Sequence, residues 1–503
     1  MKFENKMNPV LAADGAEDLL TLDDAVQLLG TSRPTLYRWL AQGEIKGLKV
    51  GKQWRFRKSD LVSYLERDPL AVAAAPEEVV EREIAFLDAE LEKLRSPVSA
   101  VDESEAEPGM DRLIRRIFQF AVASLASDIH LDPIRLEDRS GYMLRVRIDG
   151  KLQGVRCFPS ILHEVMNLHF KQMANMDLTE RKMPQDGGIP FTFRNKQYVF
   201  GVAALPTVYG EALTVRIVLK DQMMMKLDQI GISAEHPLRS WIKKSNGVIL
   251  VAGPSGSGKT TTLYSCLCEI ATPDRKTLVI SDPVDVVIPN TTTVQVNERA
   301  GMSVGAALRA AWQHDPDVLC VSGLPDGDAA RAIPEFALNG HLVLVQMAAS
   351  SAVDAVQRLI AIGVDPVAAG MSLIGVIAQR LARKLCTNCK QEIDTDSDHP
   401  LLARIRQRAA DGGYIMPSDT RLFIGRGCDQ CRNTGYRGRV PLYEAMPWSP
   451  ALMAAVMRHA NADELTDIAV SEGMRTLIAD GISRVVEGQT TLDEVFRVSL
   501  SGA

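Results

Sequence analysis

One stretch of the sequence has the residue types and spacing of a phosphate-binding loop. It reads Gly253-Pro254-Ser255-Gly256-Ser257-Gly258-Lys259-Thr260, and Thr261 opens the segment that follows. Glycines in such a loop let backbone N–H groups turn toward phosphate oxygens at the N-terminus of a helix. Lys259 adds a positive charge for the phosphates, and the Thr260 hydroxyl is a ligand for Mg²⁺. The pattern predicts that these nine residues bind ATP with Mg²⁺.

The flanking sequence supplies the elements that must position this loop. Residues 247–252 are an apolar run of the kind that forms a buried parallel strand, and residues 261–270 indicate a helix. Strand, glycine loop and helix in this order predict a RecA-like nucleotide-binding α/β domain.

A second set of residues with metal-ligand spacing lies toward the C-terminus. It consists of two pairs, Cys386/Cys389 and Cys428/Cys431, and each pair has the Cys-x-x-Cys spacing. In a reducing compartment this pattern is typical of a structural Zn²⁺ site with four thiolate ligands. We expect no open coordination position and no catalysis by this metal.

Near the N-terminus, residues 19–66 form a compact unit. Thr21 to Asp24 indicate a capped helix start, residues 33–40 a second helix, and residues 46–58 a basic hairpin. The unit resembles the excisionase and MerR-like winged helix-turn-helix family, and the clustered basic residues favour DNA binding over protein binding, which stays the alternative. By this resemblance the DNA contacts come from Ser32, Arg33, Thr35, Tyr37, Arg38, Lys49, Lys52, Arg55 and Arg57.

The rest of the chain contains many further motifs, which follow one another in a defined order. They include Ala126 to Pro133, Leu144 to Gly150, Met183 to Gly188, Leu205 to Glu211, Val294 to Gly301 and Glu472 to Met474. Together with the glycine loop, these motifs resemble the type II secretion and type IV pilus assembly ATPase family. The resemblance implies an α/β multidomain protein: a charged linker and helix at 67–109, an α+β, PAS-like N-terminal motor domain at 110–221, a P-loop domain at 226–385, and a tetracysteine zinc and helical region at 386–503.

Several positions depart from the pattern of that family. The acidic segment reads Ser281-Asp-Pro-Val-Asp285, where the family begins with Glu, so Asp282 and Asp285 survive with Arg216 as remnants of the catalytic site. Gly323 stands at the catalytic glutamate, Pro325 at an arginine, and Ala348 at a histidine. Gly188 and Gly201 replace two arginines that the family directs at phosphates, whereas Arg145, Arg147 and Arg216 remain.

These departures affect turnover more than binding. Loss of a general base costs about 10²- to 10⁴-fold in rate, whereas the glycine loop and Lys259 hold the nucleotide in its ground state. We therefore expect ATP binding with weak or absent hydrolysis. The alternative is an active enzyme in which Asp285, Asp326 or Glu335 substitutes, although Pro334 makes repositioning there harder.

Composition limits the class of protein. The chain has 503 residues, 46% hydrophobic and 24% charged, with a net charge of −6. We expect neither a leader sequence nor a membrane span, and therefore a cytoplasmic protein that reaches the inner membrane only through partners.

The resemblance implies a homo- or hetero-hexameric ring and contact with the inner-membrane platform of a secretion or pilus machine. Three functions stay open: a regulatory or scaffolding subunit, a working ATPase for pilin or pseudopilin assembly or secretion, and a nucleotide-responsive transcriptional regulator.

Overall fold

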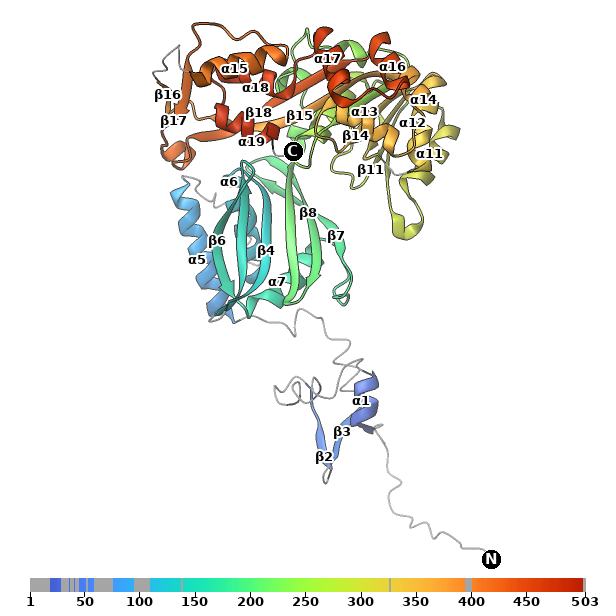
Figure 1. Ribbon diagram of the computed structural model, residues 1–503. Helices are drawn as coiled ribbons and strands as arrows, with labels where there is room; N and C mark the ends of the chain where they lie inside the picture. Colours follow the sequence, from blue (N-terminus) through green and yellow to red (C-terminus); the bar gives the residue numbers. More distant parts are fainter. Residues whose placement is uncertain are drawn as a thin grey trace, which may run out of the picture.

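The computed structural model describes residues 19–28, 36, 40, 45–50, 53–57, 76–94, 109–136, 139–324, 327–393 and 400–500. Four β-sheets and their helices organise these residues (Figure 1). In order along the chain, the first three sheets have three, six and seven strands. The fourth is a two-stranded ribbon, which lies in the sequence between the last two strands of the seven-stranded sheet.

The N-terminal module contains a small antiparallel sheet and a helix. Its elements are β1 (Leu19–Thr21), α1 (Leu22–Leu28), β2 (Leu48–Val50) and β3 (Gln53–Arg57). Thr21 and Asp24 cap α1 reciprocally, with the Asp24 N–H donating to Thr21 Oγ1 at 3.2 Å and the Thr21 N–H to the Asp24 carboxylate at 3.0 Å. The predicted capped start and the basic hairpin are therefore both confirmed, and Phe56 lies fully buried beneath the hairpin.

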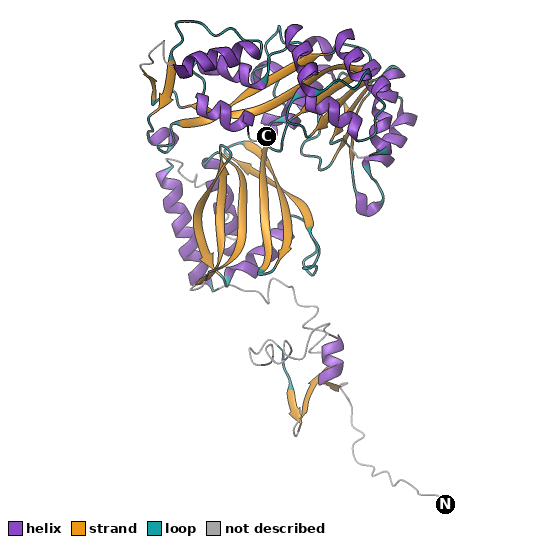
Figure 2. Ribbon diagram, in the orientation of Figure 1, coloured by secondary structure: helices purple, strands orange, loops and turns teal. Residues whose placement is uncertain are grey.

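A six-stranded antiparallel sheet with helices on one face forms the next unit (Figure 2). The sheet has the order β6-β5-β4-β9-β8-β7. The elements are α5 (Glu77–Lys93), α6 (Gly109–Ala123), β4 (Ala126–Leu136), β5 (Arg139–Ile148), β6 (Lys151–Pro159), α7 (Leu162–Met173), β7 (Gln185–Phe193), β8 (Lys196–Thr207) and β9 (Gly210–Leu219). Phe118 of α6 stacks on Phe200 of β8 with ring centroids 4.2 Å apart, which anchors the helix to the sheet.

The sequence predicts a charged helix within the segment 67–109, and α5 confirms it; the packing of this helix into the core of the unit was not predicted. Val80, Ile84, Leu87 and Leu91 are buried at its helical spacing. Glu83 on the same face is fully buried and accepts from Arg156 of β6 at 2.7 Å, which satisfies its charge.

The seven-stranded sheet has the order β12-β11-β13-β14-β10-β15-β18, and all neighbours pair in parallel except β15 and β18. Its strands are β10 (Gly247–Ala252), β11 (Thr277–Ser281), β12 (Thr291–Gln295), β13 (Val318–Ser322), β14 (Leu342–Met347), β15 (Leu373–Leu385) and β18 (Tyr436–Pro447). Residues of β10 are buried at every position, as expected for a central parallel strand.

Helices cover both faces of this sheet. Those before β15 are α8 (Lys220–Met223), η2 (Leu227–Ile230), α9 (Leu238–Trp241), α10 (Lys259–Ile270), η3 (Glu298–Ala300), α11 (Val304–Ala311), η4 (Trp312–His314), α12 (Asp328–Leu338), α13 (Ala352–Ala361) and α14 (Pro366–Ser372). Pro334 lies inside α12, as the sequence predicts.

The C-terminal part adds a ribbon and further helices. They are β16 (Lys390–Ile393), α15 (Pro400–Asp411), β17 (Leu422–Gly425), η5 (Asp429–Cys431), α16 (Pro450–Met457), α17 (Ala462–Ser471), α18 (Leu477–Val486) and α19 (Leu492–Leu500). Among the described residues, no helix has the length and apolar character that a bilayer crossing requires.

Candidate functional site

The glycine loop lies between the carboxyl end of β10 and the first turn of α10. Gly253, Gly256 and Gly258 have φ of +155°, +75° and +89°, a region that favours glycine. A Cβ on Gly253 would stand 2.4 Å from Ser257 Oγ and 2.7 Å from the Gln379 carbonyl oxygen. The local backbone therefore requires glycine where the sequence pattern has it, and the loop leads into a helix N-terminus that attracts anions.

Lys259 lies almost buried at the base of this loop. Its Nζ donates to the Pro254 carbonyl at 2.8 Å, and no carboxylate in the described chain pairs with it. Burial, with a smaller contribution from the charge of Arg380, lowers the pKa of Lys259 to about 8. The Ser257 hydroxyl is also buried without a hydrogen-bond partner. A cation and a donor that lack anionic partners fit a phosphate group at this position.

Strand β15 supports the loop from behind. The Gln379 amide donates to the Ser257 carbonyl at 2.7 Å and accepts from Thr262 Oγ1 at 2.8 Å. Arg380 donates to the carbonyl oxygens of Ser350 at 2.7 Å and Val498 at 3.2 Å. The loop thus rests on a buried polar network that reaches α19.

Sequence reasoning did not identify Gln379, Arg380 or Glu444 as part of the site. Glu444 of β18 is buried and accepts the N-terminal amides of Ala352 at 2.7 Å and Leu477 at 3.0 Å, so one carboxylate caps two helices. Burial raises the pKa of Glu444. The signal that could have identified all three is a polar residue inside a strand that is otherwise buried and apolar.

The threonine predicted to bind Mg²⁺ and the positions at which the resemblance places catalytic residues lie at the carboxyl ends of the neighbouring strands. Thr260 Oγ1 donates to the Gln346 side chain of β14 at 3.1 Å. Gly323 follows β13 with φ of +119°, and a Cβ there would meet no atom within 4 Å. Ala348 follows β14 and is exposed. Pro325 and Asp326 lie outside the described residues.

The two former arginine positions fall in one row across the six-stranded sheet. Gly188 pairs with Gly201, Gly201 with Arg216, and Arg216 with Asp128. Directly opposite residues share a face, so these positions project on the same side. A Cβ at Gly188 or Gly201 would meet nothing within 4 Å. Arg145 and Arg147 lie farther along the same sheet, where Arg145 pairs with Asp132 at 2.6 Å.

The acidic remnants follow β11 and differ in their surroundings. Asp282 is exposed, whereas Asp285 is partly buried. Burial raises the pKa of Asp285, and the nearby charge of Arg216 opposes the rise. Arg216 of the sheet therefore lies close to the acidic segment. The Arg216 Nε atom is also 3.9 Å from Asp128 Oδ1.

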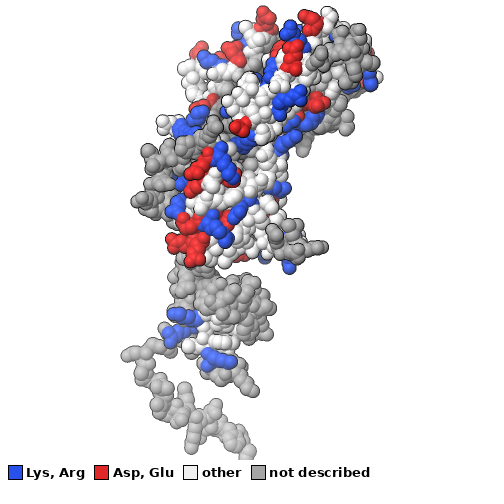
Figure 3. Space-filling view, turned by 90° about the vertical axis from the view of Figure 1, so that its left-hand side faces the viewer, with Lys and Arg blue, Asp and Glu red and all other residues white. Residues whose placement is uncertain are grey.

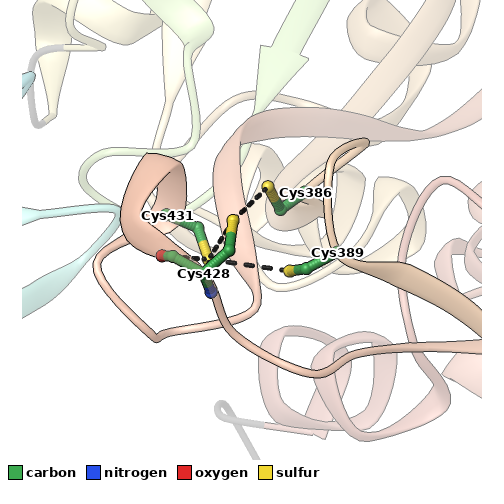
Figure 4. A group of neighbouring side chains, drawn as sticks. All are labelled: Cys386, Cys389, Cys428 and Cys431. Atoms are coloured by element: carbon green, nitrogen blue, oxygen red, sulfur yellow. Dashed lines mark hydrogen bonds between the residues drawn. The ribbon is translucent and has the colours of Figure 1, made fainter.

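The four cysteines of the two Cys-x-x-Cys pairs converge on one point (Figure 4). Their sulfur atoms all lie within 4.8 Å of one another, and three Sγ···Sγ pairs are 3.7 to 3.8 Å apart. Four thiolates about 2.3 Å from a tetrahedral Zn²⁺ stand about 3.8 Å apart, whereas a disulfide holds its sulfurs near 2.05 Å. The backbone N–H of Gly427 donates to Cys389 Sγ, and that of Gly435 donates to Cys431 Sγ, each at 3.3 Å. The cluster can therefore hold a metal ion.

In the N-terminal module, the basic residues predicted to contact DNA from the hairpin do not all lie on the same face of it. Arg55 and Arg57 alternate with buried Phe56, so they lie on the outer face of β3. Lys49 is opposite Trp54, and its Nζ is 5.9 Å from the centroid of the Trp54 ring. The described part of the module shows Lys and Arg, and no Asp or Glu, on the side in view (Figure 3). Five predicted contacts of the second helix, together with Lys52, lie outside the described residues: Ser32, Arg33, Thr35, Tyr37 and Arg38.

Comparisons with known proteins identify relatives of both parts. A family described as type II/IV secretion system protein matches residues 103–497, and a helix-turn-helix domain family matches residues 19–69. The chain is 34% identical to the type IV pilus assembly ATPase PilB of Thermus thermophilus over 83% of its own length and 45% of that protein. It is also 34% identical to a putative type II secretion system protein E of Escherichia coli, over 81% of this chain and 80% of the relative.

Solved structures share the fold. The ATPase DotB of Legionella pneumophila is similar with a TM-score of 0.55 and 16% identity, covering 78% of this chain and 95% of DotB. The pilus retraction motor PilT with bound ADP gives a TM-score of 0.51 and 20% identity, covering 76% of this chain and 96% of PilT. With the family match extending over most of the sequence, the protein belongs to the type II/IV secretion system protein family and carries a helix-turn-helix domain.

Proposed function

We propose that this protein binds ATP with Mg²⁺ at Gly253–Thr261, hydrolyses it weakly or not at all, and acts as a regulatory or scaffolding subunit of a secretion or pilus-assembly ring. The observation that carries the proposal is the contrast within one site. The phosphate loop has its required glycine conformations and a desolvated lysine, whereas Gly188, Gly201 and Gly323 offer open space where the family has charged side chains.

We infer that Glu335 and Asp285 do not replace the missing catalytic groups. Glu335 is exposed on α12, and Pro334 beside it restricts movement of that helix. Asp285 is partly buried, with burial raising its pKa and the charge of Arg216 opposing that rise. A working ATPase for pilin or pseudopilin assembly is the second candidate, and the names of the relatives favour it.

Nucleotide binding by the folded protein provides the test. A ligand at a hundredfold excess over its Kd stabilises the folded state by about 2.7 kcal/mol. ATP and Mg²⁺ should therefore raise the melting temperature of the wild type but not of Lys259→Ala. An unchanged wild-type melting temperature would refute nucleotide binding.

We also propose that the cysteine cluster binds one structural Zn²⁺ per chain. Four protein thiolates fill the coordination shell, so the metal contributes folding energy, on the order of 10 kcal/mol in small zinc domains. Elemental analysis of protein purified without chelators should find one zinc, and Cys428→Ser should release it. Purified wild type without zinc would contradict this proposal.

The N-terminal module is proposed to bind DNA. Phosphate contacts release counterions, so affinity should fall with salt at a log-log slope of about −0.9 per contact. Arg55→Ala and Arg57→Ala should each flatten this slope by about one unit, because both lie on the outer face of β3. Lys49→Ala should change the slope less, because Lys49 lies opposite Trp54 and its Nζ is 5.9 Å from the centroid of the Trp54 ring. No salt-sensitive binding to duplex DNA would leave the module as a protein-binding domain.

Membership of the same family supports a proposal for the ring and its location. We propose a homo- or hetero-hexamer in the cytoplasm that contacts inner-membrane platform components and holds several DNA-binding modules together. Effective concentration would then make DNA affinity higher in the full chain than in the isolated module. Equal affinity of the two would remove the link between ring and DNA. A nucleotide-responsive transcriptional regulator would use the same parts, and an ATP-dependent change in DNA affinity favours it.

A further inference from the structure

A cavity of about 320 Å³ lies between the six-stranded sheet unit and the cysteine cluster. One side is formed by the ends of α5 and α6 and the turn between β5 and β6. The other side is formed by β15, the turn at Asp429–Arg432 and the start of β18. Its size falls in the range of small-molecule sites, and such sites often form between domains.

The charged side chains around this cavity are unbalanced. Among the residues that the structure describes, five cations line it against two acids, Asp149 and Asp429. Two of the cations have partners, because Lys93 pairs with Glu90 and Arg383 with Glu494. The other three, Lys151, Arg432 and Arg437, form no ion pair within the described chain.

Two further features favour a phosphate-bearing ligand. The Ser124 hydroxyl lines the cavity, is 2% exposed as a residue and has no hydrogen-bond partner. Arginine offers paired N–H donors that match phosphate oxygens, and lysine adds a point charge. Leu94, Leu125 and Ile148 supply an apolar wall beside these donors.

We propose that this cavity is a second anion site, which binds a small phosphorylated molecule such as a nucleotide through Lys151, Arg432 and Arg437. The site is separate from Gly253–Thr261 and does not depend on hydrolysis there. Because its two walls come from different units, a ligand that bridges them stabilises this arrangement of the sheet unit against the C-terminal part.

Isothermal titration of ADP, without Mg²⁺, into full-length Lys259→Ala protein tests the proposal. We expect one site per chain. Adding Lys151→Ala or Arg437→Ala should weaken binding about tenfold for each charge removed, whereas Lys196→Ala, an exposed lysine outside the cavity, should leave it unchanged. Melting temperatures and zinc content establish that the variants fold.

Pyrophosphate and adenosine distinguish the part of the ligand that is recognised. Pyrophosphate that binds as tightly as ADP supports a site for free phosphates, and tighter binding of ADP supports a nucleotide site. No heat from either phosphate compound overturns the proposal. Binding that is unaffected by Lys151→Ala and Arg437→Ala also overturns it, because that binding would belong to the glycine loop.

Discussion

The two halves of the nucleotide site differ in how completely they are built. On the binding side, Lys259 is buried and Gln379 holds the loop through two hydrogen bonds of 2.7 and 2.8 Å. On the side of chemistry, Gly201 and Gly323 leave open space. On our proposal, holding a phosphate and accelerating its transfer depend on separate residues, so one can be kept while the other is lost.

The largest expected effect concerns the support behind the loop. Glu494 is buried against Arg383 and Arg497. Although burial opposes it, hydrogen bonding to these arginines lowers the pKa of Glu494 from 4.5 to about 2. The folded-state pKa is depressed, so the stabilisation, about 3 kcal/mol, is complete above pH 4.5 and is lost as the pH falls toward 2.

Glu494→Gln should therefore speed amide hydrogen exchange in α19 at pH 7 by an amount that corresponds to about 3 kcal/mol. Glu487→Gln is the matched control, because Glu487 is exposed and pairs with Arg484 at 3.3 Å, so its loss should cost under about 1 kcal/mol. Equal exchange in the two variants would show that the Glu494 pairs do not support α19.

Gln379→Ala removes the direct support of the loop. It leaves the Ser257 carbonyl and the Thr262 hydroxyl without their partner, at a cost of about 1–3 kcal/mol. We expect ATP affinity to fall about tenfold in a binding titration. The exposed Gln391 offers the control Gln391→Ala, which should bind as the wild type does. Unchanged affinity in Gln379→Ala would mean that the loop keeps its conformation unaided.

How far the sequence predicts this site depends on the kind of interaction. The β10 strand, the loop and α10 follow from local pattern, as do the Cys-x-x-Cys pairs, because their spacing is set along the chain. The Gln379 and Glu444 contacts could not be predicted, since they join residues separated by 33 to 122 positions. The burial of α5 was missed because its apolar stripe needs a partner, α6, that lies beyond a charged segment.

Restoring side chains at the open positions sharpens the comparison further. The double variant Gly188→Arg/Gly201→Arg should fold normally, since a Cβ meets nothing at either position, and should tighten ATP binding a few-fold by adding charge.

Gly323→Glu should destabilise the folded protein by about 1–3 kcal/mol, because φ of +119° is strained for any residue other than glycine. Thermal melts and ATP titrations measure both effects. If Gly323→Glu is as stable as the wild type and restores hydrolysis, the missing side chain alone accounts for the loss of hydrolysis.

The smallest effect is the pH dependence of binding. The pKa of Lys259, about 8 in the free protein, must rise when a phosphate binds, because the anion favours the charged form. Affinity for ADP should change little near pH 7 and decline above pH 8, approaching tenfold per unit. Lys259→Arg stays charged and should abolish the slope if it binds. An equal slope in both proteins would place the titrating group elsewhere.

The most direct test measures ATP binding and steady-state hydrolysis on the same preparation, beside Lys259→Ala and a working pilus assembly ATPase of the family. Our account predicts that the wild type binds one ATP per chain at the glycine loop, that Lys259→Ala loses this binding, and that turnover is about 10²- to 10⁴-fold below that of the working enzyme. Turnover equal to that of the working enzyme, and abolished by Lys259→Ala, would contradict it.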